Sequence, residues 1–343
     1  MKTQHLWSRD IPAAVRLNPP LDARALREDL NRASDYMWRP EEPFRFDGFF
    51  GSETKVYHNG EWQGLSLRSQ GGSLKRTDPG GPGLDDFQDT PLMSHTPYIA
   101  AMLRDWNVPV RSVRLLKLPA GASIMEHRDT YHGFEYGQLR LHVPITTNPD
   151  VVMSIRGQKW HWPAGEAWYG DFGSLHEVHN NGPTDRVHLV VDVLVTPTVL
   201  ALFPEHFAQL AARTDILYHE PASEALDVKL LRALECEFRV PSTLVRGIFD
   251  VDDGIIGQLD SRIYMKDGAL RWMVDGRDIV RLSPMSGNRL AFTGWAMERY
   301  FEYACEHGRI SRLDLVLRCG REVTRIHFDL HSTEKLLQEV ALS

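Results

Sequence analysis

The chain has 343 residues, 42% of them hydrophobic and 25% charged, which is the composition of an ordinary globular protein and argues against disorder. Because this length exceeds one average domain, we expect one large domain with a smaller one appended to it. The formal net charge of -7 supplies no general basic field, which argues against nucleic acid or an anionic membrane as the main partner.

The sequence does not indicate a membrane span, a secretory signal or a disulfide framework. No run approaches the ~18 apolar residues of a membrane span. Residues 1–12 mix charges with few apolar side chains, unlike the apolar core of a secretory signal. The three cysteines are far apart and show no CxxC spacing, so neither a disulfide framework nor a zinc ribbon is indicated. We therefore expect a cytoplasmic protein.

The pattern of residues 21–106 predicts two helices and a hairpin. Apolar residues at helical spacing predict helices over 21–38 and 98–106. Two short segments of β type, 55–58 and 62–67, flank Asn59-Gly60, a typical hairpin turn. The run 77–86 is rich in glycine and proline, so we expect a flexible surface loop, of the kind that often covers the mouth of a site.

From residue 113 onward the pattern changes to short strands separated by turns. We expect strands over 113–118, 138–145, 151–155, 167–169 and 186–195. Many short strands at this spacing favour a mainly β antiparallel sandwich. The double-stranded β-helix, or cupin-like jelly roll, is the variant that places metal ligands in its mouth. Flanking helices would complete this domain.

Two of these strands carry polar side chains at alternate positions. The polar residues are Gln138, Arg140 and His142 in one strand and Arg186, His188 and Asp192 in the other. A period of two places them on a single face of each strand. Polar groups cost free energy against an apolar core unless they are paired, so these faces either meet water or line a ligand cavity.

The last third of the chain is predicted to be a small α+β domain without a catalytic motif. We expect a helix over 199–212 and a hinge around 220–223. Beyond the hinge, helical stretches (224–238 and 295–306) mix with strand-like ones (261–265, 313–317 and 324–328). The expected division is residues 1–214 for the jelly-roll domain with its N-terminal helical segment, and residues 215–343 for the C-terminal domain.

The most informative motif is His127-Arg128-Asp129, followed in the chain by His176. Two ligands separated by one residue point to the same side of an extended segment, so one short piece of chain can hold a metal twice. A histidine from a distant strand or loop would complete a 2-His-1-carboxylate triad. That triad leaves positions open on non-haem Fe(II) for a co-substrate and O₂, and so indicates oxidation chemistry. By itself the HxD pattern is weak in a chain with 15 histidines.

Arg186 strengthens this interpretation because it begins the strand that follows His176. An Fe(II) oxygenase of this type needs a second anion site for a dicarboxylate. A buried guanidinium binds a carboxylate through two oriented hydrogen bonds. The other interpretation of Arg186 is a surface strand residue with a solvated head, which is usual for arginine.

Four ordered motifs carry a family resemblance. They are RSVRLLKLPAGASIMEHRD (111–129), LRLHVPI (139–145), GEAWYGDFGSLHEVHN (165–180) and RVHLVVDV (186–193), with a weaker similarity at GEWQGLSLRSQGG (60–72). In these motifs the chain resembles the aspartyl/asparaginyl β-hydroxylase family of Fe(II)/2-oxoglutarate-dependent oxygenases. It is most similar to the branch of bacterial proline hydroxylases.

The resemblance implies His127, Asp129 and His176 as the catalytic iron ligands. His179 competes with His176, since both lie in HEVH. We favour His176 because the family's second histidine lies ten residues before the arginine. That arginine, Arg186, would bind the far carboxylate of 2-oxoglutarate.

Three further residues are expected at the co-substrate. The family's RxH motif corresponds to Arg140 and His142, which would lie beside 2-oxoglutarate. His188 follows Arg186 by two positions on the same strand face, where it would either support the co-substrate site or have a structural role.

The resemblance also implies a reaction. The enzyme would use Fe(II), 2-oxoglutarate and O₂ to hydroxylate an unactivated C–H bond, and would release succinate and CO₂. Related halogenases lose the carboxylate ligand so that chloride can take its place, so Asp129 favours hydroxylation. Similarity to the proline enzymes favours a small-molecule substrate, either a free amino acid or a small derivative. Arg68 could pair with the substrate's carboxylate, or be an ordinary exposed strand residue.

Two alternatives are left open. A peptidyl aspartyl or asparaginyl β-hydroxylase would have an open groove and act on peptides. A metal-binding jelly-roll sensor or binding protein would bind metal without consuming 2-oxoglutarate, and would leave Arg186 unexplained.

Overall fold

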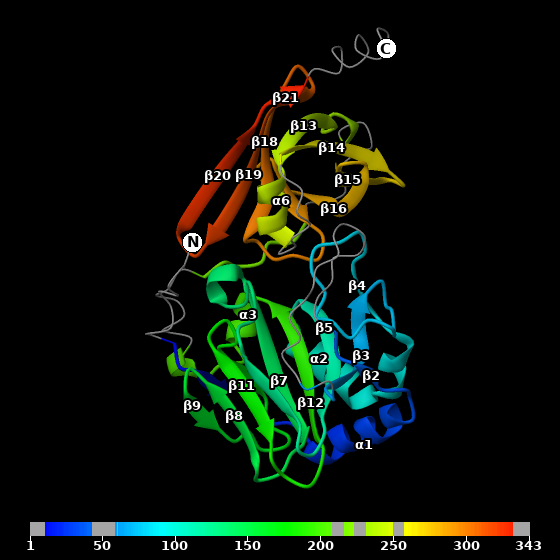
Figure 1. The fold of residues 1–343 in the computed structure, drawn as a ribbon, viewed down its shortest axis with the longest axis vertical. Helices are drawn as coiled ribbons and strands as arrows, with labels where there is room; N and C mark the ends of the chain where they lie inside the picture. The colour runs from blue at the N-terminus through cyan, green and yellow to red at the C-terminus, as the bar shows by residue number, and fades with distance from the viewer. Residues whose placement is uncertain are drawn as a thin grey trace. The chain divides into compact units, whose positions relative to one another are not determined.

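The computed structural model describes residues 11–42, 59, 61–207, 216–222, 231–249 and 257–331. The chain divides into two compact units. The boundary lies after His219, and residues 81–86 belong to the second unit. None of the described helices is long and apolar enough to cross a membrane. Figure 1 shows the elements of both units.

The first unit contains two antiparallel β-sheets (Figure 1). The strands of the larger sheet are β1 (Ala14–Arg16), β2 (Arg39–Pro40), β3 (Gln63–Gln70), β4 (Phe87–Asp89), β5 (Val110–Leu118), β7 (Gln138–Thr146), β10 (Trp168–Gly170) and β12 (Arg186–Leu194). Those of the smaller sheet are β6 (Ser123–His127), β8 (Val151–Ile155), β9 (Gln158–Trp160) and β11 (His176–Asn180). In the larger sheet the strand order is β1-β10-β7-β12-β5-β3-β2, with β4 paired to β3. In the smaller sheet it is β6-β11-β8-β9. Two such sheets with non-sequential pairing form the double-stranded β-helix that the sequence predicts.

Two helices cover the outer face of the larger sheet. The helix α1 (Ala23–Ser34) is capped by Asp22, whose side chain accepts hydrogen bonds from two backbone N–H groups of the first turn. The helix α2 (Pro97–Trp106) packs beside it. Leu26 and Ile99 are buried with the outward side chains of β7 and β12, such as Leu141 and Leu189, in one hydrophobic core. Short helical segments lie at η2 (Pro91–His95), η3 (Phe134–Tyr136) and α3 (Pro197–Leu200).

The inner faces of the two sheets carry both apolar and polar side chains. A second apolar cluster includes Ile124, Met153 and Phe172. Beside it, β12 is buried at every position and pairs with β5 and β7 on its two sides. Its alternation is confirmed: Leu189 and its apolar neighbours join the outer core, and Arg186 and the other polar residues face inward.

The second unit is a nine-stranded antiparallel sheet of order β20-β19-β18-β17-β16-β15-β14-β13-β21. Its strands are β13 (Cys236–Pro241), β14 (Gln258–Lys266), β15 (Ala269–Val274), β16 (Arg277–Met285), β17 (Arg289–Phe292), β18 (Arg299–Glu306), β19 (Arg309–Cys319), β20 (Glu322–Phe328) and β21 (Leu330–His331), with the helix α6 (Ser242–Phe249). The sheet curls until β13 contacts β20 (Figure 1). Aromatic side chains fill its interior, among them Trp272, Phe292 and Phe301.

Several predicted elements need correction. The helix expected over 295–306 is wrong, because this segment contains β18, where pairing with β17 and β19 overrides the local pattern. The helix expected over 224–238 is wrong at its end, where Cys236 begins β13, while residues 223–230 lie outside the described part. The surface loop 77–86 begins with two buried residues, Thr77 and Asp78. The hairpin strand 55–58 lies outside the described residues. The helix expected over 199–212 is interrupted, because α3 ends at Leu200 and a turn follows it, and residues 208–212 lie outside the described part.

Candidate metal centre

Two adjacent strands of the smaller sheet bring the predicted ligands together. His127 is the last residue of β6 and His176 the first of β11, and the strand register places them opposite each other. Asp129 follows two residues after His127, where its backbone N–H donates to the carbonyl of Phe172 at 2.9 Å. One ligand atom from each of the three side chains lies within 4.8 Å of the other two. Within the described residues, this is the group that could hold a metal ion.

Both imidazoles are oriented by their own backbone. Nδ1 of His127 donates to the carbonyl of Met125 at 2.8 Å, and Nδ1 of His176 donates to the carbonyl of Ser174 at 3.0 Å. With the proton on Nδ1, the lone pair is on Nε2 of each ring, which is then the nitrogen that can bind a metal. Burial lowers the pKa of His176 to about 4, so this imidazole is neutral and able to bind a metal at neutral pH.

The carboxylate of Asp129 is charged. Burial alone would raise its pKa, but Arg140 and the neighbouring imidazoles hold it well below its usual range. Arg140 NH1 donates to Oδ2 of Asp129. Oδ1 lies 3.8 Å from Nε2 of His127. The triad therefore offers two imidazole nitrogen donors and one anionic oxygen donor, which is the donor set of a non-haem Fe(II) site.

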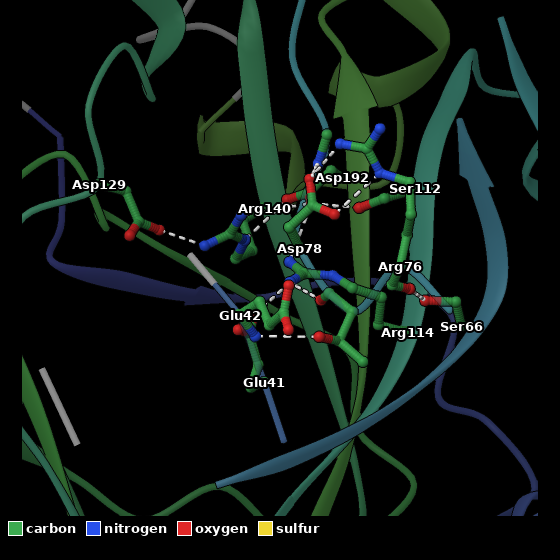
Figure 2. Close-up of polar contacts among 12 residues, drawn as sticks. Glu41, Glu42, Ser66, Arg76, Asp78, Ser112, Arg114, Asp129, Arg140 and Asp192 are labelled. Atoms are coloured by element: carbon green, nitrogen blue, oxygen red, sulfur yellow. Dashed lines mark hydrogen bonds and ion pairs between the residues drawn. The ribbon is translucent and has the colours of Figure 1, made fainter. Parts of the chain in front are cut away.

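A chain of alternating charges leads away from Asp129 (Figure 2). Arg140 donates through Nε to Asp192 Oδ1 at 2.7 Å, and Arg114 NH2 donates to Asp192 Oδ2 at 3.2 Å. Arg114 NH1 donates in turn to Glu41 Oε1 at 2.7 Å. Sequence reasoning assigned no role to Arg114, Glu41 or Asp192. Only Asp192 gave a signal, as a charged residue on the polar face of a buried strand.

Arg186 is buried at 2% exposure without a compensating carboxylate. Among the described residues, none forms an ion pair with it, and burial is the one cause that lowers the pKa of its guanidinium. NH2 donates to Nδ1 of His188 at 2.8 Å, and Nε has no hydrogen-bond partner. A guanidinium without an anion at this depth is costly, so the site is suited to an anionic ligand.

His142 and His188 lie together beside Arg186. Their Nδ1 atoms are 3.2 Å apart, and the ring of His142 stacks on Phe172 with centroids 4.6 Å apart. Burial, followed by the charge of Arg186, holds the pKa of both imidazoles well below the usual value. Nε2 of His142 is buried without a partner, so it can still bond a ligand.

Two residues considered from the sequence have other partners. His179 lies on the opposite face of β11 from His176, where it contacts Ser123 Oγ at 2.9 Å and Glu177 Oε2 at 3.2 Å. Arg68 donates to Asp89 Oδ1 at 2.7 Å and to two backbone carbonyls. None of these bonds involves a residue of the triad.

The donor chemistry fits the cofactors that the sequence motifs imply. The triad can hold Fe(II) and leave positions open for O₂ and a chelating co-substrate. The unpaired guanidinium of Arg186 suits the far carboxylate of 2-oxoglutarate.

Comparison with known proteins agrees with this site. Residues 23–196, just over half of the chain, match the family model described as aspartyl/asparaginyl beta-hydroxylase. L-proline cis-4-hydroxylase from Rhizobium meliloti (strain 1021) is 27% identical over 164 residues, which are 46% of this chain and 55% of that protein. The chain thus spans about half the length of this curated relative.

Solved structures show weaker similarity. A 2OG-Fe(II) oxygenase family oxidoreductase from Burkholderia pseudomallei is 13% identical with a TM-score of 0.37, covering 53% of this chain and 85% of that one. A prolyl-4-hydroxylase from Pseudomonas putida is 14% identical with a TM-score of 0.33, covering 54% of this chain and 93% of that one. On the match of the family model, the chain belongs to the aspartyl/asparaginyl β-hydroxylase family.

Proposed function

We propose that this protein is an Fe(II)- and 2-oxoglutarate-dependent hydroxylase that acts on a C–H bond of a free amino acid or a small amino-acid derivative. The observation that carries the proposal is the buried guanidinium of Arg186, which has no carboxylate partner within the described residues. A row of contacts through His188, His142 and Phe172 connects it to His176 of the triad. A metal site alone does not explain this guanidinium. A dianionic co-substrate that also binds the metal does.

The chain's own residues have separate tasks in this reaction. His127, Asp129 and His176 would hold the iron. Bound Fe(II), with 2-oxoglutarate and O₂, supplies the oxidant for an unactivated C–H bond, and 2-oxoglutarate leaves as succinate and CO₂. Arg186 would bind the far carboxylate of 2-oxoglutarate and thereby fix its position.

The surroundings of Arg186 favour a single orientation of the co-substrate. His188 accepts a hydrogen bond from one nitrogen of the Arg186 guanidinium, so the remaining N–H groups of the guanidinium are available to the ligand. His188 and His142 are neutral, so they add hydrogen-bonding capacity without further charge. Phe172 and Trp162 pack against His142 and exclude water from this end of the site.

The amino-acid substrate is supported by the relative named as an L-proline hydroxylase. Asp129 supports hydroxylation, because a carboxylate ligand occupies the position that a halide would need. We also place the enzyme in the cytoplasm, which its three widely spaced cysteines suggest.

The test is turnover. The full chain is loaded with Fe(II) and 2-oxoglutarate without oxygen, and is then exposed to air with a panel of free amino acids, N-acyl amino acids and short Asp- or Asn-containing peptides. We expect succinate to form above the uncoupled rate with a free amino acid or small derivative. Stimulation by peptides alone would indicate a peptidyl hydroxylase instead, and metal binding without any 2-oxoglutarate consumption would indicate a sensor.

Two histidine variants provide the internal control. His176→Ala removes a nitrogen ligand and is expected to abolish succinate formation and to weaken Fe(II) binding by at least about 10-fold. His179→Ala, on the other face of the same strand, should retain both. The reverse result would exchange the assignments of these two histidines.

A further inference from the structure

The two carboxylate oxygens of Asp129 have different partners. Oδ1 faces the other ligands, 3.8 Å from Nε2 of His127. Oδ2 accepts a hydrogen bond from NH1 of Arg140. One oxygen therefore faces the metal position while the other is held by a guanidinium.

Arg140 is itself held in place by Asp192. On the neighbouring strands β7 and β12 these two residues lie directly opposite each other. Nε of Arg140 donates to Oδ1 of Asp192 at 2.7 Å, and NH2 donates to Oδ2 at 3.3 Å. Because a guanidinium is rigid and planar, two bonds along one edge fix the direction of the remaining nitrogen, NH1.

Asp192 is anchored independently of Arg140 (Figure 2). Its carboxylate also accepts from Ser112 Oγ at 2.5 Å and from Arg114 NH2 at 3.2 Å. Arg114 is fixed in turn by Glu41 and by the carbonyl of Thr77. These groups are buried, so the position of Arg140 is set by the framework of the larger sheet.

This arrangement affects how many coordination positions are open. The facial triad leaves three positions for a chelating co-substrate and O₂ only if each protein ligand supplies one atom. A carboxylate that binds through both oxygens would take one of those three. We propose that Asp192, acting through Arg140, holds Asp129 as a one-oxygen ligand and so keeps the third position open. Asp192 is a positioning residue in this scheme, and the proposal rests on the function proposed above.

The test uses the full chain with Co(II), which reports its ligands through its visible spectrum. Arg140→Met frees Oδ2, so the Co(II) spectrum should change before any 2-oxoglutarate is added, and Co(II) should bind at least as tightly as in the wild type. The affinity of the Co(II) protein for 2-oxoglutarate should fall about 10-fold, because a second Asp129 oxygen occupies one of its positions.

Asp192→Asn is a nearly isosteric change that tests the interaction between Asp192 and Arg140. It releases Arg140 from its anionic partner, so the guanidinium can lie across both oxygens of Asp129 and compete with the metal. Co(II) should then bind about 10-fold more weakly, opposite to the effect of Arg140→Met. Asp29→Asn is the matched control, since Asp29 is equally buried and paired with Arg32 but lies in α1. It should leave both affinities unchanged.

The outcomes separate this inference from the proposed function. An unchanged Co(II) spectrum in Arg140→Met would overturn the inference, as would a parallel loss of Co(II) and 2-oxoglutarate affinity in both variants. If the wild-type Co(II) protein binds no 2-oxoglutarate at all, the proposed function itself fails.

Discussion

At the scale of single residues, three arginines of the first unit differ in their carboxyl partners. Arg140 bonds Asp129 and Asp192, and Arg114 bonds Asp192 and Glu41. Arg186 has no such partner among the described residues. The first two guanidiniums are therefore satisfied by the protein, and the third is the one suited to an anionic ligand.

Glu41, which accepts a hydrogen bond from Arg114, is protonated at neutral pH and makes stability depend on pH. Burial raises the pKa of Glu41 to about 8, against the lowering effect of Arg114. The folded chain keeps this proton up to about pH 8, whereas the unfolded chain releases it near 4.5. Its contribution to the free energy of unfolding is full below pH 4.5 and is lost as pH rises through 8, by at most about 1.4 kcal/mol per pH unit.

The variant Glu41→Gln should remove this component of the pH dependence. Denaturant unfolding of the metal-free protein at pH 5, 6.5 and 8 measures it for the variant and the wild type. We expect a flatter dependence in the variant. Equal slopes in the two proteins would show that Glu41 is ionised throughout this range in the folded chain.

At the scale of elements, the two faces of β12 have different roles: one packs in the hydrophobic core, and the other carries the residues of the proposed site. Leu189 is fully buried in the outer core, and Arg186 lies on the inner face. Leu189→Ala should cost about 2–5 kcal/mol of unfolding free energy through the lost burial and the cavity. Its affinity for 2-oxoglutarate, measured by calorimetry on the metal-loaded protein, should stay within about 2-fold of the wild type because successive side chains of a strand point to opposite faces, and that of Leu189 lies on the face away from Arg186. A large loss of 2-oxoglutarate affinity would mean that the two faces are coupled.

Some strands of the first unit could be predicted from the sequence, and others could not. Strict alternation predicts β7 and β12, including their polar faces. The strands β6 and β11 were not predicted, because each has five residues and carries charged or imidazole side chains within it. They form by pairing with each other and with β8. The HxD spacing located the ligands without these strands, since it needs only an extended segment.

The charge network could not be predicted for a related reason. Arg114 and Glu41 are 73 residues apart in the chain, and their contact depends on the assembled sheet. A glutamate within Pro40-Glu41-Glu42-Pro43 carries no local pattern that marks it as buried. Motif resemblance supplied the triad and Arg186, but it did not supply the partners that hold Arg140.

At the scale of the whole molecule, we keep the division into a jelly-roll domain, 1–214, and a C-terminal domain, 215–343, as a proposal. The triad, Arg186 and the charge network all belong to the first compact unit. The second unit has its own aromatic core around Trp272, which is fully buried. Its strand content was underestimated, because no strands were predicted over β15 to β17, although β15 and β17 alternate in burial, and the segment of β18 was predicted as a helix.

This division predicts that damage to one core spares the other. Trp272→Ala should destabilise the second unit by about 3–5 kcal/mol. Co(II) affinity of the triad should remain at the wild-type value below the unfolding transition. Differential scanning calorimetry and a Co(II) titration measure the two effects. Loss of Co(II) binding in the folded variant would show that the units are not independent.

The most direct measurement of the central claim is 2-oxoglutarate binding to the metal-loaded protein with and without the Arg186 guanidinium. Arg186→Met should weaken 2-oxoglutarate about 100-fold, as expected for the loss of charge-assisted hydrogen bonds worth about 3 kcal/mol, and should leave metal affinity intact. Arg68→Met, which removes a guanidinium already paired with Asp89, is the control and should bind 2-oxoglutarate as the wild type does. Equal 2-oxoglutarate affinity in Arg186→Met and the wild type would contradict the account.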